Sequence, residues 1–260
     1  MRSLAGFTTL PFILIGSLAG CASIADTEGE LAAESANTGV PDGKAARAVD
    51  GAYTYFGVTA DLRKCPSPGC GGWFLRSLNR PMTKCHDGRH AEACYTPVID
   101  WSEVKLTEAQ KAEMLDASSK DAASGGVYAM ARGRLVPTNS TTPRPELGRF
   151  VITEAWVAEG TTVASGLFVK VKDNGLRCFA APCPNLTEET LNLPRSTNIA
   201  AIDWKPAELT DDQIEECIQL MYEPDGIMVA GDRYTVYDNG SAAKARTATA
   251  AYYRLTDPAE

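Results

Sequence analysis

The sequence predicts a mainly β protein built from two tandem copies of one small domain, each with the element order β-β-β-α-β-β. Three observations support this fold class. The chain aligns with itself once, each copy contains several segments rich in aromatic and β-branched residues, and each copy has one clear helix start. This order is that of an OB-like small barrel, in which the helix lies between the third and fourth strands. Because order alone does not fix topology, an α+β sandwich, with the helix covering a sheet, is the alternative.

The internal alignment carries the prediction of two copies. At an offset of 113 residues the matches are Cys65 with Cys178, Cys70 with Cys183, Leu78-Asn79 with Leu191-Asn192, and Pro81 with Pro194. At an offset of 103 residues, Ile99-Asp100-Trp101 matches Ile202-Asp203-Trp204. Identities at cysteine, tryptophan and proline rarely recur by accident, so we expect a duplicated domain.

The elements follow in the same order in both copies. First strands are expected at 53–59 and 167–172, second strands at 73–78 and, more weakly, near 190–193, and third strands end in the two Ile-Asp-Trp segments. Helices then start at Thr107-Glu-Ala-Gln110 and Thr210-Asp-Asp-Gln213, which are capping boxes with acidic residues in the first turn. Fourth strands are expected at 126–136 and 227–237, and fifth strands at 149–157 and 247–255.

The N-terminal part of the chain has the pattern of a targeting signal followed by a disordered tether. A short apolar run after Arg2 has the pattern of a secretory signal and is too short to span a membrane. The segment Leu18-Ala19-Gly20-Cys21 resembles a bacterial lipobox, in which the cysteine is lipidated and becomes the first residue. Ala22 stands where an aspartate suggests inner-membrane retention, so we expect an outer-membrane lipoprotein. The expected organisation is a signal peptide at 1–20, a disordered tether at 21–52, and repeat domains at 53–160 and 161–260.

Composition narrows the classes of function. The chain has 260 residues, of which 44% are hydrophobic, as is typical of globular proteins. A net charge of -8 and a pI near 5.0 argue against a nucleic-acid partner. Two histidines leave little room for a His-based metal site, so we expect no metal and no cofactor.

The positions of the eight cysteines predict three different roles. Cys21 is the expected lipid attachment. Three local disulfides are expected within short, turn-containing segments: Cys65–Cys70, Cys85–Cys94 and Cys178–Cys183. The segment from Cys85 to Cys94 occurs only in the first copy and carries its own pair. Cys217 then remains as a buried core residue on the second helix.

Alternatives to this interpretation stay open. Cys85, His86, His90 and Cys94 together form a ligand set that zinc accepts, and the four cysteines matched between the copies form another. The Ser241-Ala-Ala-Lys244 segment matches a Ser-x-x-Lys pattern, but its partner motifs are absent and it follows a turn. Asp100 and Asp203 recur at matched positions, where we expect them to bond local backbone N–H groups rather than form a catalytic pair. We therefore assign no catalytic residue.

One surface feature points to binding. Basic residues outnumber acids between Arg63 and Arg89, where Asp87 is the only acid, and aromatic residues lie among them. The candidate binding residues are Trp73, Phe74, Arg76, Arg80, Lys84 and Arg89. Aromatic and basic side chains on one face suit an anionic envelope glycan, a lipid headgroup or a secreted protein. An alternating strand, with arginine outward and tryptophan inward, is the simpler explanation of the same pattern.

Several short motifs carry a resemblance: Cys70-Gly-Gly-Trp73, Leu78-Asn-Arg-Pro81, Ile99-Asp-Trp101 and Glu154-Ala-Trp156. In these the chain resembles a family of uncharacterised secreted bacterial lipoproteins with a domain of unknown function. The resemblance covers about residues 53–157. The second copy is degenerate, with Tyr252 in place of Trp156. The resemblance implies no established activity and no catalytic residue.

These observations together predict a lipid-anchored cell-envelope protein that acts as a non-catalytic binding or interaction module. Its expected partners are the membrane, through the lipid, and an anionic envelope glycan or a secreted protein. Two alternatives belong to other classes: an envelope hydrolase that uses carboxylates, and an inhibitor of secreted hydrolases that presents the rigid loop from Cys85 to Cys94.

The lipid anchor can be tested directly. Mass spectrometry of the purified protein is expected to find a lipidated Cys21, and Cys21→Ser is expected to move the protein to the soluble fraction, because several acyl chains together hold a protein on a membrane. An unmodified Cys21 contradicts the anchor.

Overall fold

The computed structural model describes residues 54–138, 147–238 and 240–256. All of them belong to one compact unit, Arg47–Glu260. Cys21, the expected signal peptide and the expected tether lie outside the described residues. No helix within the described ranges is long and apolar enough to cross a membrane.

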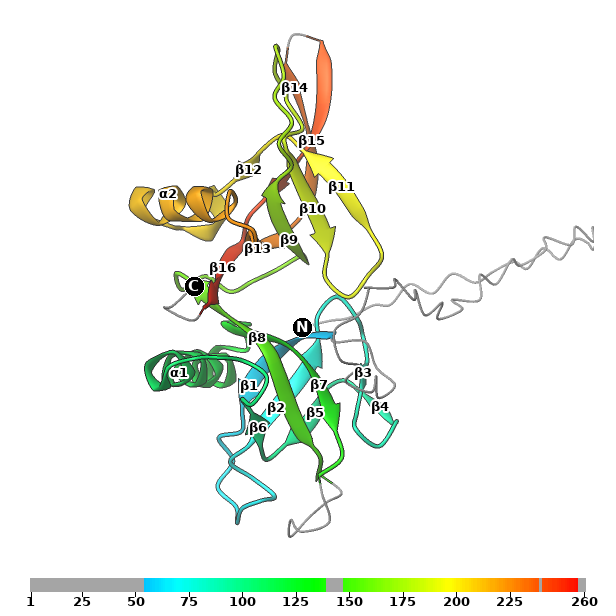
Figure 1. Cartoon of the computed structure of the whole chain (residues 1–260), viewed down its shortest axis with the longest axis vertical. Coiled ribbons are helices and arrows are strands. Elements are labelled where there is room, and N and C mark those ends of the chain that lie inside the picture. Colours follow the sequence, from blue (N-terminus) through cyan, green and yellow to red (C-terminus); the bar gives the residue numbers. More distant parts are fainter. Residues whose placement is uncertain (1–53, 139–146, 239, 257–260) are drawn as a thin grey trace, which may run out of the picture. The chain divides into compact units, whose positions relative to one another are not determined.

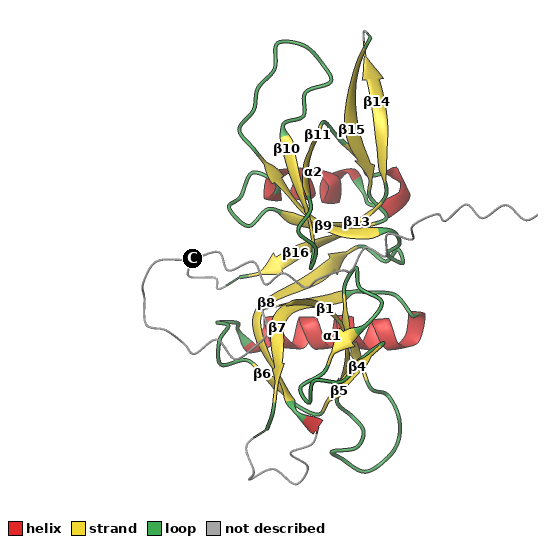
Figure 2. Ribbon diagram, turned by 90° about the vertical axis from the view of Figure 1, so that its right-hand side faces the viewer, coloured by secondary structure: helices red, strands yellow, loops and turns green. Residues whose placement is uncertain are grey.

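Most strands of the described residues form one eleven-stranded sheet (Figures 1 and 2). Its strands are β1 (Thr54–Ala60), β2 (Trp73–Ser77), β5 (Cys94–Thr96), β6 (Ile99–Asp100), β7 (Ala129–Val136), β8 (Arg149–Glu159), β9 (Leu167–Asp173), β10 (Leu186–Thr190), β11 (Ser196–Ile199), β13 (Ile227–Gly231) and β16 (Ala250–Leu255). The order is β11-β10-β9-β13-β16-β8-β7-β1-β2-β5, with β6 paired parallel to β8 and the neighbours along this path antiparallel. The protein is therefore mainly β, as expected.

Two smaller sheets complete the strands. The first is a short hairpin of β3 (Thr83–Lys84) and β4 (His90–Ala91). The second has the order β12 (Ile202–Asp203), β15 (Ser241–Thr247) and β14 (Arg233–Asp238), with β14 and β15 antiparallel. The β14–β15 hairpin belongs to the second half of the chain.

Corresponding strands of the two halves follow in the same order from each end of the large sheet to its centre. On one side it runs β5-β2-β1-β7-β8, and on the other β11-β10-β9-β13-β16. At the centre, β8 and β16 pair antiparallel, with Val157 opposite Tyr253 and Trp156 opposite Arg254. The two halves of the chain therefore meet through their last strands.

Two asparagines form reciprocal hydrogen bonds across this centre. Asn79 Nδ2 donates to the carbonyls of Phe168 (2.7 Å) and Leu191 (3.0 Å), and its Oδ1 accepts from the Phe168 N–H (2.9 Å). Asn192 Nδ2 donates to the carbonyls of Tyr55 (2.7 Å) and Leu78 (2.9 Å), and its Oδ1 accepts from the Tyr55 N–H (2.8 Å). Both asparagines have positive φ, 58° and 60°, a region that asparagine tolerates. Each half thus binds backbone of the other.

The two α-helices begin where their capping boxes predict. Helix α1 (Glu108–Ser124) is capped by Thr107, and α2 (Asp211–Leu220) by Thr210, each with the reciprocal glutamine bond. Helix α1 ends at Gly125, whose φ of 72° suits a residue without a Cβ. A short 3₁₀ helix, η2 (Lys205–Ala207), precedes α2.

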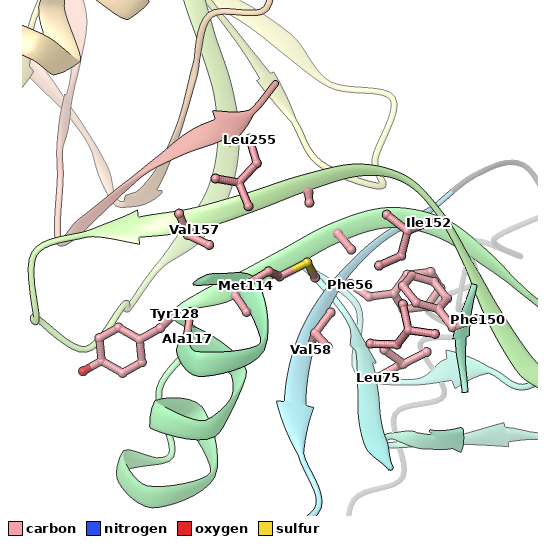
Figure 3. Packing of buried hydrophobic residues seen from close by; sticks show 14 residues of the cluster. Phe56, Val58, Leu75, Met114, Ala117, Tyr128, Phe150, Ile152, Val157 and Leu255 are labelled. Carbon is pink, nitrogen blue, oxygen red and sulfur yellow. The ribbon is translucent and has the colours of Figure 1, made fainter. Parts of the chain in front are cut away.

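Three apolar clusters fill the fold. The first packs α1 against the sheet of the first half, through Met114 and Ala117 (Figure 3). The second packs α2 against the sheet of the second half, through Cys217 and Met221. Because side chains alternate along a strand, the third cluster lies on the opposite sheet face at the centre; its buried members are Leu78, Met130, Trp156, Leu191, Met228, Ala230, Ala250 and Tyr252.

The expected OB-like barrels do not form: no closed barrel is present within the described residues, and the large sheet is open. The last strand of each half pairs with the last strand of the other half instead of closing on its own first strands. Helices on one face of an open sheet correspond more closely to the α+β alternative.

The expected strand at 227–237 is also corrected, because it is two strands that belong to different sheets. The break falls at Gly231, which has a φ of 153° and where a Cβ would lie 1.7 Å from the Thr247 carbonyl oxygen. Similarly, the expected fifth strand at 247–255 begins at Ala250, and the second strand near 190–193 lies earlier, at Leu186–Thr190.

The reciprocal asparagine bonds generate a stability prediction. Asn192→Asp keeps the shape and the acceptor but replaces two donated hydrogen bonds with a carboxylate facing two carbonyl oxygens. We expect the free energy of unfolding to fall by about 2 kcal/mol or more, as measured by urea denaturation. The matched control is Asn198→Asp, an exposed position whose Oδ1 acceptor for Thr187 is retained, and it is expected to change stability by less than about 0.5 kcal/mol. Equal effects of the two substitutions contradict a joining role for Asn192.

Candidate binding surface

The three expected disulfides are present. Cys65–Cys70, Cys85–Cys94 and Cys178–Cys183 each have a Cα–Cα distance of 5.5 Å. Cys85 and Cys94 are bonded to each other, so the zinc alternative built on them retains only the imidazoles of His86 and His90. The other zinc alternative uses four cysteines that are likewise engaged.

Cys217 is a free cysteine buried in the second-half cluster, at 2% exposure. Burial raises the pKa of its thiol to about 12, with smaller contributions from Glu159 and Glu216. A thiol that stays protonated is a poor nucleophile, so the position has the properties of the expected core residue.

The Cys85–Cys94 disulfide closes the β3–β4 hairpin and holds it against β2. Thr83 Oγ1 accepts from the Ser77 N–H at 2.7 Å and donates to the Glu92 carbonyl at 3.2 Å. Beside the hairpin lies a cavity of about 290 Å³, lined by His86, Asp87, Arg89, His90 and Tyr95 among others. Arg89 is largely exposed and bonded to Asp87.

An arginine lies over two aromatic rings next to this hairpin. Phe74 and Tyr95 are opposite each other on β2 and β5, with ring centroids 5.5 Å apart. The Arg63 guanidinium lies 5.2 Å from the Phe74 centroid and 5.8 Å from that of Tyr95. We call Arg63, Phe74 and Tyr95 the Arg63 stack.

The Arg63 guanidinium is fixed in place. Its Nε and Nη2 both donate to the Asp61 carboxylate at 2.8 Å, and Nη2 also donates to the Gly69 carbonyl at 3.3 Å. The hydrogen bond from Arg63 holds the pKa of Asp61 below its usual value, so this pair stays charged across the neutral range. Even so, 59% of the Arg63 side chain is exposed.

Of the predicted binding residues, some lie together on one surface, and two, Trp73 and Arg80, have structural contacts elsewhere. Phe74 and Arg76 alternate with Trp73 along β2, so they lie on the opposite face, and Trp73 packs partly buried against the first-half core. Arg80 donates from Nε to the Asn192 carbonyl at 3.0 Å, which assigns it to the contact between the halves. Lys84 and Arg89 are exposed on the β3–β4 hairpin segment.

The candidate surface is therefore Arg63, Phe74, Arg76, Lys84, Arg89 and Tyr95. Arg63 and Tyr95 are absent from the residues that the sequence predicted for it. Arg63 stood in the basic run, but nothing local indicates that it lies over a ring. Tyr95 could be found only through its register opposite Phe74, which depends on β5, a strand that the sequence pattern did not predict.

The matched aspartates bond local backbone, as expected. Asp100 Oδ1 accepts from the Ser102 N–H at 2.9 Å, and Asp203 Oδ1 accepts from the Lys205 N–H at 3.1 Å. Asp100 also accepts from Arg149 Nη1 at 2.6 Å.

Asp121 is the one carboxyl of the described residues whose pKa is raised, to about 8. Burial raises it, and hydrogen bonds from the Tyr128 and Ala129 N–H groups act in the opposite direction. A hydrolytic acid must reach its substrate, whereas Asp121 is 1% exposed and its two carboxylate oxygens accept hydrogen bonds from backbone N–H groups at the start of the next strand. Asp121 instead connects the end of α1 to the start of β7.

Comparison with known proteins gives one match. A family model described as a domain of unknown function, DUF6748, matches residues 54–258. The match extends over both halves of the chain, beyond the region of about 53–157 that carries the sequence resemblance. No curated protein and no solved structure shows significant similarity to the chain.

The raised pKa of Asp121 makes stability depend on pH. The native carboxyl keeps its proton up to about pH 8, whereas in the unfolded chain it loses the proton near its ordinary value of 3.8, so this group makes the native state less stable as pH rises from about 4 to about 8. We expect Asp121→Asn to flatten that part of the pH dependence, as measured by urea denaturation at several pH values. Asp116→Asn, at an exposed position on the same helix, is the control and is expected to leave the slope unchanged. A slope that Asp121→Asn leaves unchanged contradicts the assignment.

Proposed function

The chain belongs to the family of proteins with a DUF6748 domain, and on this premise we propose that it is an extracytoplasmic, non-catalytic binding module for an anionic envelope glycan. The proposed contact surface is the candidate surface defined above, which consists of Arg63, Phe74, Arg76, Lys84, Arg89 and Tyr95. The Arg63 stack is the observation that carries the proposal.

A fixed arginine suits recognition of acidic groups. Asp61, Gly69 and the two rings hold the guanidinium in one orientation, so little side-chain freedom is left to lose when a ligand binds. Within the described residues, Nη1 of Arg63 has no hydrogen-bond partner, and planar guanidinium N–H groups match carboxylate and sulfate oxygens. The exposed edge of the stack is therefore ready to donate.

Charge favours an anion at the same place. Arg63 and Arg89 are paired with Asp61 and Asp87, and Arg76 and Lys84 are two further exposed cations on this surface, although the whole chain carries -8. A local positive surface on an acidic protein attracts acidic ligands while the remainder repels them. An extended acidic glycan can contact several of these cations along its length.

The disulfides favour a location outside the cytoplasm, where an envelope glycan is within reach. Three disulfides are typical of proteins in an oxidising compartment outside the cytoplasm. We further propose attachment to the outer membrane through lipidated Cys21, on the strength of the Leu-Ala-Gly-Cys motif.

We also propose that the two halves are copies of one domain. The mirrored strand order supports this, as do the reciprocal bonds of Asn79 and Asn192, which the sequence alignment matches to each other. The family match across both halves is compatible with copies that now form a single folding unit.

A secreted protein is the second candidate partner. The observation that favours it is the disulfide-closed β3–β4 hairpin, from which Arg89 projects with 84% of its side chain exposed. A rigid loop with a basic residue is the kind of structure that protease inhibitors present. Inhibition of a panel of secreted proteases by the full chain, lost in Arg89→Ala, would favour this partner.

The glycan proposal is tested by binding of the full chain to polygalacturonate, to heparin, and to neutral dextran as a control. We expect saturable, salt-sensitive binding to at least one acidic glycan and none to dextran. Arg76→Glu, at an exposed position, is expected to weaken binding at least fivefold because it reverses one charge of the surface. Lys205→Glu, an exposed cation of the second half, is the matched control and is expected to bind like the native chain. Absence of acidic-glycan binding, or equal losses in both variants, overturns the proposal.

A further inference from the structure

A second site lies in the other half of the chain, away from the surface proposed above. A cavity of about 490 Å³ lies where the β10–β11 turn faces the β14–β15 sheet, and its lining includes Arg195, Ser196, Thr197, Arg233 and Arg246. Three arginines around one cavity are unusual in an acidic chain. The volume is in the range of cavities that bind small solutes.

Two of these arginines surround a buried glutamate. Glu188 is inaccessible to solvent, and Arg246 is 1% exposed. Arg246 donates to both Glu188 oxygens, from Nε at 2.7 Å and from Nη2 at 3.0 Å, and its Nη1 donates to the Gly231 carbonyl. Arg233 donates from Nε to the same carboxylate at 2.8 Å.

Burial raises the pKa of Glu188, but the hydrogen bonds and charges of Arg246 and Arg233 outweigh it, so the pKa stays below its ordinary value. The carboxylate is therefore ionised, and its charge is shared between two guanidinium groups. Two guanidinium groups and one carboxylate leave an excess of one positive charge, and the Arg233 side chain is 38% exposed.

The remaining charges do not remove this excess. Asp232 and Arg195 also line the cavity, and they offset each other. Within the described residues, the Arg195 guanidinium and Nη1 of Arg233 have no hydrogen-bond partner. Donors without partners and an unbalanced positive charge thus occur at the same cavity.

The corresponding place in the first half shows that packing does not require these charges. Leu75 on β2 pairs with Val58 on β1, and Glu188 on β10 pairs with Val171 on β9 in the same way. Leu75 is fully buried in an apolar cluster. Because an apolar residue of similar volume is usually at least as stabilising as a buried ion pair, packing alone does not explain Glu188 and its arginines.

We propose that this cavity binds the oxyanion group of a small solute, a carboxylate, sulfate or phosphate. Arg195 and Arg233 donate directly to its oxygens, the hydroxyl of Thr197, which lies opposite Glu188 in the sheet, adds a neutral donor, and Arg246 supplies buried charge behind them. Glu188 holds Arg233 and Arg246 in position. The three candidate anions share the oxygen geometry that a guanidinium recognises.

The test is isothermal titration calorimetry of the full chain with inorganic phosphate, sulfate and acetate, at constant ionic strength set with chloride. At least one anion is expected to bind saturably with a dissociation constant below about 10 mM, about 2.7 kcal/mol. Preference for phosphate, sulfate or acetate then distinguishes a phosphorylated, sulfated or carboxylated solute.

Two exposed arginines of the second half provide the variant and its control. Arg195→Gln is expected to weaken binding at least fivefold with an unchanged melting temperature in chloride, because Arg195 is exposed. Arg177→Gln, whose arginine bonds Asp173 outside this cavity, is expected to bind like the native chain. If no anion binds saturably, or if Arg195→Gln binds as tightly as Arg177→Gln, the proposal is wrong. Because the glycan experiment reads the effect of Arg76→Glu in the first half and this one the effect of Arg195→Gln in the second, either proposal can fail while the other stands.

Discussion

The antiparallel pairing of β8 with β16 determines how both halves bury their cores. Strand β16 comes from the end of the chain, yet Leu255 lies in the cluster of the first half and Ala251 in that of the second. On the opposite face, Trp156 of β8 and Tyr252 of β16 are fully buried in the central cluster. Without this pairing each half would have an unpaired edge strand and an incomplete core. The family match over 54–258 includes both of the strands that pair here.

The pairing also explains why the expected barrels do not form. A small barrel closes when its last strand returns to its own sheet edge, whereas here the last strand of each half is occupied by the other half. Within the described residues, β5 and β11 are the strands at the two ends of the sheet path, and β6, which pairs only with β8, is a further edge strand. The short β5 and β11 leave few unpaired backbone groups at those edges, which limits pairing with other chains.

Local features were predictable and distant ones were not. Thr107 and Thr210 define helix starts because capping involves residues three apart, and each disulfide closes a short segment. Pairing of β8 with β16 joins strands far apart in sequence, so no local pattern contains it. The β14–β15 hairpin had a local signal, the Asp238-Asn239-Gly240 turn between two runs of strand-forming residues, but the strand was expected to end before that turn.

In the candidate sites, too, groupings within one strand could be predicted from the sequence, and groupings of residues far apart in the chain could not. Phe74 and Arg76 could be grouped from alternation along one strand, which also separates Trp73 from them. The trio of Glu188, Arg233 and Arg246 could not, since its members are 45 and 58 residues apart and come from β10, β14 and β15. Sequence alone gives Glu188 no special role and leaves it just outside the strand expected near 190–193.

The two halves share one strand order, yet each has a buried or half-buried glutamate at a different position in that order. Glu154, two residues before Trp156, accepts hydrogen bonds from Tyr55, Arg132 and Trp156, whereas Ala250 stands two residues before Tyr252. Glu188 is surrounded by arginines where the first half has Leu75. Glu154 and Glu188 thus each have an apolar counterpart in the other half, and the two lie on different sheet faces. Because the shared central cluster stays apolar, each half can carry one charged group without losing the contact that joins the two halves.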